Sequence, residues 1–278
     1  MDKNKFKNIL VAFVGIIVIT LVTADLFLDE EYRNTKNVQT SCPTGIFTKS
    51  AMIFDSLQIC ATRLVPDAKL KYAANVAAEW LDNDGDGDAD EPRIINSLQE
   101  SRSLVVMSLD GFSSLAFFKI AAASVIGGYT IQDLSAEETN NPTRRDASQE
   151  EIHHIIVVGG WIKTLPKIFS DQKSDGSDLY NIWRFANDNG HYSYDDPTCD
   201  DSCKTVEFFY LATAAYLGSM ADLFSDEMRL KDRLAMKQHI PGIMHIFESS
   251  DYSYPTNHWP TGVYIHKKNI HLSGINSD

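Results

Sequence analysis

Residues 146–158 read Asp146-Ala-Ser-Gln-Glu-Glu-Ile-His-His-Ile-Ile-Val-Val158, and this stretch decides how the rest of the chain is interpreted. An aspartate and a Ser-x-x-Glu capping box begin a helix there, and a Gly-Gly pair ends it. In that helix Glu150 and His154 lie four residues apart on one face, with Glu151 beside them. Acidic residues also suit the first turn of any helix, so a purely structural helix is the alternative to a metal site.

A second stretch, Thr205–Tyr210, adds another acidic residue, Glu207, within a helix predicted over 204–217. Glu-Glu-x-x-His followed by Glu-Phe-Phe resembles the metal-binding helices of lethal-factor-like gluzincin metallopeptidases. This chain differs from them at one position, because a glutamate stands where their motif has its first histidine. The resemblance covers roughly residues 110–218 and implies a zincin-like fold.

The same resemblance implies the roles of individual residues. The zinc ligands would be Glu150, His154 and Glu207. Glu151 would be the general base that activates a water molecule. Tyr194, or its neighbour Tyr192, would offer a phenol to a developing oxyanion. His191 is a candidate for an additional ligand.

An acidic loop near the front of the chain, Leu-Asp-Asn-Asp-Gly-Asp-Gly-Asp-Ala-Asp over 81–90, predicts a calcium site. Alternating aspartates followed by Gly87 reproduce the start of an EF-hand-type loop, here spanning 82–93. The twelfth position, where an EF-hand has a glutamate, is Arg93. Closure by the ninth residue or by Glu91 would make the loop similar to those of dockerin and thrombospondin-type modules. The predicted calcium ligands are Asp82, Asp84, Asp86, Asp88 and Asp90.

Residues 1–24 have the features of a cleavable signal peptide. Three lysines precede an apolar run over 9–22, and small residues at 22–24 suit a signal peptidase. We therefore expect a secreted protein that makes no membrane contact after cleavage, with residues 25–50 as a polar lead-in. The alternative is an uncleaved single-pass anchor, although a spanning helix needs about 20 apolar residues.

The four cysteines suit an oxidising compartment. Of the three pairings they allow, we favour the local one, Cys42–Cys60 with Cys199–Cys203. A zinc site at the second pair is less favoured, because it lacks a further Cys or His pair at matching spacing. The net charge of −13 repels phosphate backbones, so nucleic acid is not an expected partner.

The composition, 44 % hydrophobic and 10 % aromatic, is that of a packed globule. We predict a mostly helical α+β fold, with a single globular domain over 51–278 and a calcium-binding helix–loop–helix near its N-terminus. A strand is predicted over 129–134 and a long functional loop over 170–204. Helices are predicted over 70–81, 93–107, 112–126, 146–158, 204–217 and 220–239, with the third largely buried.

The leading hypothesis is a secreted, metal-dependent hydrolase that acts on an extracellular peptide or protein and holds Ca²⁺ for stability and Zn²⁺ for catalysis. The first alternative is a non-catalytic extracellular calcium-binding protein. A carbohydrate-binding or matrix-associated domain that uses the aromatic loop and tail is the second.

Overall fold

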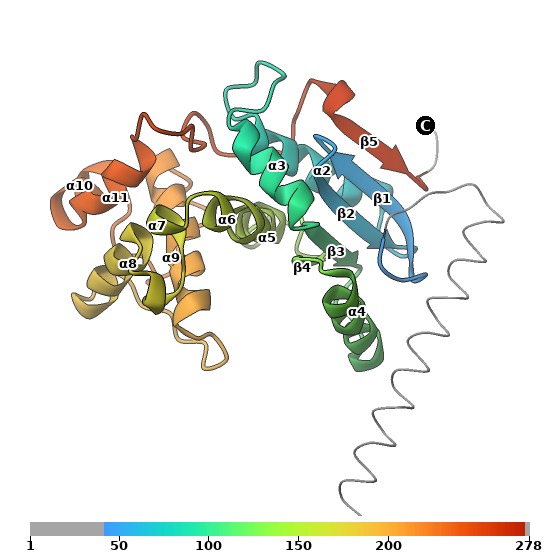
Figure 1. Cartoon of the computed structure of the whole chain (residues 1–278), viewed down its shortest axis with the longest axis horizontal. Helices are drawn as coiled ribbons and strands as arrows, with labels where there is room; N and C mark the ends of the chain where they lie inside the picture. Colours follow the sequence, from blue (N-terminus) through green and yellow to red (C-terminus); the bar gives the residue numbers. More distant parts are fainter. Residues whose placement is uncertain (1–41, 276–278) are drawn as a thin grey trace, which may run out of the picture.

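The structure is a computed structural model that describes residues 42–275 (Figure 1). The predicted signal peptide and most of the predicted lead-in lie outside these residues. A five-stranded sheet lies on one side of the molecule, helices α8 to α11 lie on the other, and α5 lies between them. The strands are β1 (Phe47–Ile53), β2 (Leu57–Thr62), β3 (Leu104–Ser108), β4 (Ile131–Ser135) and β5 (Ile270–Ser273).

The sheet is mixed, with the strand order β4-β3-β2-β1-β5. A tight turn joins β1 and β2 into an antiparallel hairpin, and Phe54 and Asp55 in this turn both have positive φ angles. Parallel pairing then extends the sheet from β2 to β3 and from β3 to β4. The C-terminal segment returns to add β5 antiparallel to β1, so the first and last strands of the described chain are neighbours and β5 forms the edge of the sheet.

The helical elements of the described chain fall between and after these strands. They are α2 (Asp67–Leu81), α3 (Pro92–Glu100), α4 (Ser114–Gly127), α5 (Ala147–Ile156), α6 (Ile162–Thr164), α7 (Pro166–Phe169), α8 (Asp178–Asp188), α9 (Asp201–Leu217), α10 (Arg233–His239) and α11 (Pro241–Phe247). Shorter turns are η1 (Val157–Trp161), η2 (Lys173–Asp175) and η3 (Lys267–Asn269). Hydroxyl or carboxylate caps begin several of them. At the start of α5 the cap is Asp146, which accepts from the backbone N–H of Ser148, and not the predicted capping box of Ser148 and Glu151.

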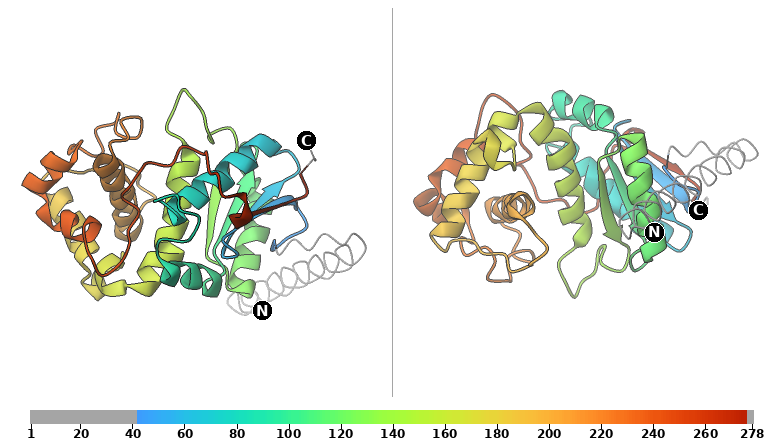
Figure 2. Two further views of the ribbon diagram at one scale, coloured as in Figure 1. Left: turned by 90° about the horizontal axis from the view of Figure 1, so that it is seen from above. Right: turned by 60° about the horizontal axis from the view of Figure 1, so that its bottom comes forward.

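The two faces of the sheet bury two separate hydrophobic cores, because successive side chains of a strand point to opposite faces. Val105 and Met107 of β3 belong to the main core, which α2, α5 and α9 share. Leu104 and Val106 belong to a small second core, which also contains Ile120 of α4. Helices α4 and α5 therefore cover opposite faces of the sheet (Figure 2, right).

Helix α5 continues into the π-helical turn η1, which is wider than an α-helical turn and packs beside α3. The carbonyl oxygen of Gly159 accepts hydrogen bonds from the hydroxyls of Ser97 (2.9 Å) and Ser101 (3.0 Å). A Cβ at Gly159 would collide with the hydroxyl of Ser103, which follows α3, so glycine allows this segment to approach η1 closely. The sequence predicted that the Gly-Gly pair ends the helix. In the structure the pair instead lies within η1 and allows α3 to pack against this turn.

The α+β class and both predicted cysteine pairs are confirmed: Cys42–Cys60 fastens the start of the described chain to β2, and Cys199–Cys203 closes the turn into α9. Several predicted boundaries are wrong. The helix over 93–107 ends at Glu100, because the β-branched residues after it form β3, and the predicted loop over 170–204 contains α8. The helix over 220–239 begins only at Arg233, and β1 begins inside the predicted lead-in.

Helix α4 differs most from its prediction. It was expected to be largely buried because its sequence is apolar on nearly every side, yet only Ile120 and Ala123 are buried in the structure. The crossover from β3 to β4 places it on the outside of the sheet, where no further layer of the described chain covers it.

Replacing both Cys42 and Cys60 by serine should lower the free energy of unfolding by about 3 kcal/mol, because this bridge closes a longer loop than the other one. The matched double replacement of Cys199 and Cys203 should cost less, about 2 kcal/mol, since only four positions separate those residues. Urea denaturation of the two variants gives the comparison. Equal losses, or a larger loss for the second pair, would contradict it.

Candidate metal centre

Helices α5 and α9 pack against each other and bring the three predicted zinc ligands together. One ligand atom from each of Glu150, His154 and Glu207 lies within 4.8 Å of the others. His154 is buried and the two carboxylates are partly buried, with Nε2 of His154 3.7 Å from Oε2 of Glu207. Two residues one helical turn apart and a third at least 53 positions further along the chain thus form one compact group suited to a divalent cation.

Two atoms of this group are buried without a hydrogen-bond partner in the described structure: Nε2 of His154 and Oε2 of Glu207. Their separation of 3.7 Å is too long for a hydrogen bond, so the charge attraction of an ion pair is the contact between them, and the hydrogen-bonding capacity of both buried atoms is unused. Nε of Arg145 and the hydroxyl of Tyr192 are unpartnered in the same way. Most buried polar groups in proteins are hydrogen-bonded, so such atoms facing one another indicate a site that binds a ligand.

The pKa shifts of Glu150 and His154 also indicate a site that can bind a cation. Burial raises the pKa of Glu150 from 4.5 to about 8, against the opposing charges of His154 and Arg145. Burial by itself would lower the pKa of His154, but the carboxylates of Glu207, Glu151 and Glu150 outweigh it and raise the value from 6.5 to about 9. The metal-free group therefore retains protons that a bound cation would displace.

Arg145 completes the charge balance and was not singled out by the sequence. Its guanidinium contacts Glu150 at 3.3 Å and Glu227 at 2.8 Å, and it also donates to the carbonyl oxygen of Asp222. Glu227 comes from the loop after α9, 77 residues beyond Glu150, so no local pattern marks it. The cluster thus contains four carboxyl groups, of Glu150, Glu151, Glu207 and Glu227, beside the single guanidinium of Arg145, so a divalent cation that displaces the retained protons would add positive charge where acidic groups are in excess.

Glu151 lies beside the three-ligand group rather than in it. Its Oε2 accepts a hydrogen bond from the side-chain amide of Gln132 (2.5 Å) and lies 3.5 Å from Nδ1 of His154. Gln132 belongs to β4, so the edge strand of the sheet orients this carboxylate, and no local sequence pattern indicates the contact. Glu151 is the more exposed of the two helix glutamates, with its side chain 26 % exposed against 14 % for Glu150.

The predicted phenols lie close enough to sense this group electrostatically. Burial raises the pKa of both Tyr192 and Tyr194, and the charge of Glu207 is the next largest cause in each case. The pKa of Tyr194 rises to about 12, and Glu150 contributes to it as well. The ring of His191 contacts the ring of His239, with 4.9 Å between centroids, and His191 is not a member of the group.

His153, the neighbour of His154, faces the aromatic core. Its Nε2 is 2.8 Å from the hydroxyl of Tyr254, and its ring lies against Trp80 and Phe209. Burial holds the pKa of His153 well below its usual value. The pair of histidines therefore divides into one core residue and one candidate ligand.

The acidic loop forms the second candidate ion site. Ligand atoms of Asp82, Asp84 and Asp86 lie within 4.8 Å of one another. Asp82 is fully buried, and its carboxylate accepts from the backbone N–H of Gly87 (2.9 Å) and from the hydroxyl of Tyr264 (2.5 Å). This shows how the first aspartate of the loop is fixed in place.

The remaining acidic residues of the loop differ in how far they are buried. Burial raises the pKa of Asp90 to about 6, and the nearby charges of Asp84 and Asp82 add to this rise. The side chain of Asp88 is exposed and is not in the three-aspartate group. Glu91 caps α3 and binds Arg93 at 2.6 Å, so the residue at the twelfth position is paired with the residue two positions before it.

The C-terminal segment holds this loop against α2. His266 Nε2 lies 2.8 Å from the carbonyl oxygen of Gly85, and Asn269 donates to that of Gly87 (2.9 Å). Asn83 accepts from the backbone N–H of Asn257 (2.7 Å), and the buried carboxylate of Glu79 accepts from that of Gly262 (2.6 Å). The loop is thus a junction between the first helix of the sheet layer and the end of the described chain.

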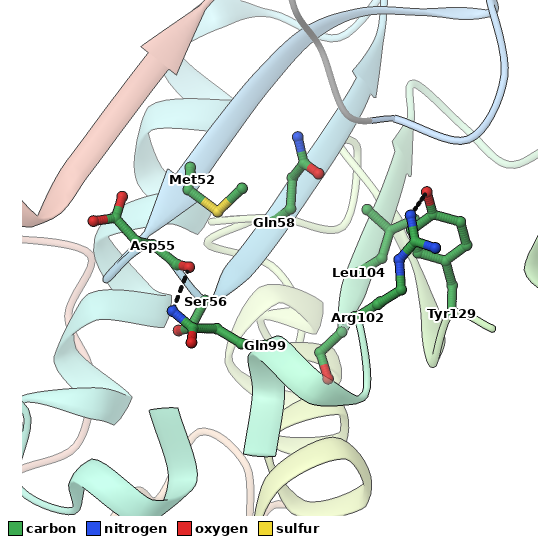
Figure 3. Close-up of a pocket in the computed structure, with 9 residues that line it drawn as sticks. Met52, Asp55, Ser56, Gln58, Gln99, Arg102, Leu104 and Tyr129 are labelled. Atoms are coloured by element: carbon green, nitrogen blue, oxygen red, sulfur yellow. Dashed lines mark hydrogen bonds between the residues drawn. The ribbon is translucent and has the colours of Figure 1, made fainter. Parts of the chain in front are cut away.

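A surface pocket of about 250 Å³ lies elsewhere, near the starts of β2 and β3 (Figure 3). Gln58, Leu104 and Met52 line it, and Arg102 at its side donates to the hydroxyl of Tyr129 (2.6 Å). None of the predicted site residues lines this pocket. We therefore place the candidate chemistry at the α5–α9 contact.

Comparisons with protein-family models, with curated proteins and with solved structures found no match. The resemblance to gluzincins consequently stays a prediction that rests on the motif residues and on the geometry of the group.

The pKa shifts predict a pH dependence of stability for chelator-treated protein. The raised pKa of His154 adds to the free energy of unfolding below pH 6.5, and this stabilisation is lost as the pH rises through about 9. Ionisation of the buried Glu150 carboxyl likewise lowers the free energy of unfolding as the pH rises from 4.5 through about 8. The melting temperature should therefore fall between pH 6 and pH 9 by more than in a Glu150→Gln variant. Identical profiles in thermal denaturation would count against a protonated cluster.

Proposed function

We propose that this chain is a metal-dependent hydrolase of extracellular peptides or proteins, with Zn²⁺ held by Glu150, His154 and Glu207. The observation that carries the proposal is the pair of buried, unpartnered atoms, His154 Nε2 and Glu207 Oε2, that face one another across 3.7 Å. Nitrogen and carboxylate oxygen are the donors that zinc uses in catalytic sites. The resemblance of the two helices to those of gluzincins supports the same assignment.

The chain's own residues supply the rest of the chemistry. A bound zinc ion polarises a carbonyl group and lowers the pKa of a water molecule. Glu151 would take a proton from the attacking water and pass it to the leaving amine nitrogen as the C–N bond breaks. Gln132 orients Glu151 through the hydrogen bond from β4, and Tyr194 would donate to the developing oxyanion.

We propose that the acidic loop binds Ca²⁺ and stabilises the fold. The support is the convergence of Asp82, Asp84 and Asp86, together with the raised pKa of Asp90 beside them. Oxygen ligands from several carboxylates are what calcium prefers. Because the loop joins α2 to the C-terminal segment, an ion there would hold the two together.

Secretion is part of the proposal. Two disulfides in the described chain fit an oxidising compartment, and the residues before position 25 have the pattern of a signal peptide. Among residues 42–275, none of the helices combines the length and the apolar composition that a membrane-spanning segment requires.

One observation favours a second candidate, a non-catalytic extracellular protein. Arg145 lies 3.3 Å from Glu150 and already supplies a positive charge to this carboxylate. In such a protein the cluster would be a buried ion-pair network, held by Arg145, that strengthens the α5–α9 contact. The two candidates differ in whether the group takes up a metal and in whether Glu151 matters for anything but stability.

The Glu151→Gln variant tests the catalytic proposal. It should lower cleavage of an unfolded-protein or peptide-library substrate by at least about a hundredfold, because the amide cannot accept a proton. Its zinc content and melting temperature should stay close to those of the wild type. Glu138→Gln, on a carboxylate that pairs with Arg144 at the surface, is the matched control and should keep full activity. Undiminished cleavage by Glu151→Gln would show that another residue is the base.

The calcium proposal has its own test, in which chelated protein is titrated with Ca²⁺ during thermal denaturation. At a calcium concentration of about a hundred times Kd, the wild type should gain about 2.7 kcal/mol of stability. Asp84→Asn should lose this gain, because Asp84 is one of the three converging aspartates. Asp88→Asn should keep it, since that side chain lies outside the group and a residue at the seventh position coordinates through its backbone carbonyl. An equal response of both variants would contradict the assignment.

A further inference from the structure

A pocket lies among helices α7, α8 and α11, on the side of the molecule away from the sheet (Figure 1). Its volume of about 490 Å³ is within the range of about 300–1,000 Å³ that is usual for small-molecule sites. One isoleucine from each of the three helices lines it, and these residues are Ile168, Ile182 and Ile246. No residue of the candidate metal centre or of the acidic loop lines this pocket, so it is a separate candidate for binding.

Two carboxylates, of Asp178 and Asp251, line the pocket from different parts of the chain. Asp178 lies in the first turn of α8, and Asp251 follows α11. Neither carboxylate takes part in an ion pair or a hydrogen bond within the described residues, and Arg93 donates to the backbone carbonyl oxygen of Asp251 instead. No lysine or arginine lines the pocket. The negative charge there therefore has no fixed counter-charge in the pocket itself.

Tyr252 also lines the pocket and shows that the two carboxylates lie close to one point. Its side chain is only 7 % exposed, and its hydroxyl donates to the carbonyl oxygen of Ile246 (2.9 Å). Burial raises the pKa of Tyr252 to about 12, and the charges of Asp178 and Asp251 both add to this rise. Since both carboxylates act on the same phenol, one cation in the pocket can interact with both of them.

We propose that this pocket binds an organic cation with an apolar stem, as an arginine side chain or a free alkylguanidine presents it. The carboxylates of Asp178 and Asp251 would pair with the charged group, and a planar guanidinium has enough donors for both. The isoleucines would pack against the stem, because such side chains bury their methylene groups on apolar surface while the charged end stays among polar groups.

Other ligands fit the pocket less well. His245 also lines it, but the two compact groups of metal-ligating atoms in the described chain do not include His245 or either aspartate, so a metal ion would lack a shell. An anion would be repelled by both carboxylates. A sugar stacks on an open aromatic face, and Tyr252, the aromatic residue of the lining, is almost fully buried. A carboxylate at the start of α8 also suits the helix dipole, which explains Asp178 without a ligand but does not explain Asp251.

The test is isothermal titration calorimetry of the chain from residue 25 to 278 with three small molecules. They are agmatine, Nα-acetyl-arginine methylamide and, as the matched neutral compound, Nα-acetyl-citrulline methylamide, in which a urea group replaces the guanidinium. We expect the arginine derivative to bind and the citrulline derivative to bind about tenfold more weakly or not at all, because the urea carries no charge. Binding of the arginine derivative would assign a side chain as the source of the cation, and binding of agmatine alone would assign a free alkylguanidine.

Substitutions test the two carboxylates separately. Asp178→Asn and Asp251→Asn should each weaken binding of the cation by about fivefold, since an ion pair open to water contributes only modestly. Asp188→Asn, also on α8, is the matched control and should bind like the wild type, because Asp188 pairs with Arg184 (3.2 Å) and does not line the pocket. Asp178 belongs to the first turn of α8, so the comparison of the arginine and citrulline derivatives on the wild type decides the matter even if Asp178→Asn fails to fold.

Three results would overturn the proposal. The first is an absence of binding by agmatine and by the arginine derivative up to about 10 mM. The second is equal affinity of the wild type for the arginine and citrulline derivatives. The third is wild-type affinity in a folded Asp251→Asn variant. None of these results bears on the proposed hydrolase, because the pocket shares no residue with the candidate metal centre.

Discussion

The contact between α5 and α9 imposes the constraint on which the account of this protein depends. It buries a histidine nitrogen and a carboxylate oxygen 3.7 Å apart, with neither atom hydrogen-bonded in the described structure. Burial of polar atoms costs free energy unless a partner compensates for it. The ion pair between His154 and Glu207 offsets part of this cost, and a ligand that bridges the two atoms would offset more of it. We favour a ligand, because Glu150 lies within reach of the same point.

Three neighbouring parts of the structure hold the residues around this group in place. The sheet provides Gln132, which fixes Glu151 from the edge strand β4. The loop after α9 provides Glu227, which together with Glu150 holds Arg145. The aromatic core takes up His153 through Tyr254, and this fixes the rotation of α5 that turns His154 toward α9. The acidic loop follows the C-terminal end of α2, and the C-terminal segment holds this loop in place. Both therefore support α2, the helix against which α5 packs.

Local patterns in the sequence predicted the parts of the structure that local interactions determine. The start of α5 near Asp146, the turn of alternating aspartates and the Cys199–Cys203 bridge depend on residues a few positions apart, and Cys42–Cys60 joins residues 18 positions apart. Contacts such as Arg145 with Glu227 and Gln132 with Glu151 depend on how distant elements pack, and no spacing marks them. The burial of α4 was predicted wrongly because its apolar sequence suggests a covered helix, whereas the crossover from β3 to β4 places it on the outer face of the sheet. The helix predicted over 93–107 is too long, because the end of this range forms β3 and pairs with β2 and β4, two strands that are distant in the sequence.

Metal analysis of the purified mature chain tests the central claim most directly. Protein loaded with zinc, dialysed and analysed by inductively coupled plasma mass spectrometry should retain one zinc ion per chain. The His154→Ala and Glu207→Ala variants should retain almost none, while their calcium content stays the same as that of the wild type. Zinc-free wild-type protein, or equal zinc in the wild type and both variants, would contradict a metal centre at the α5–α9 contact.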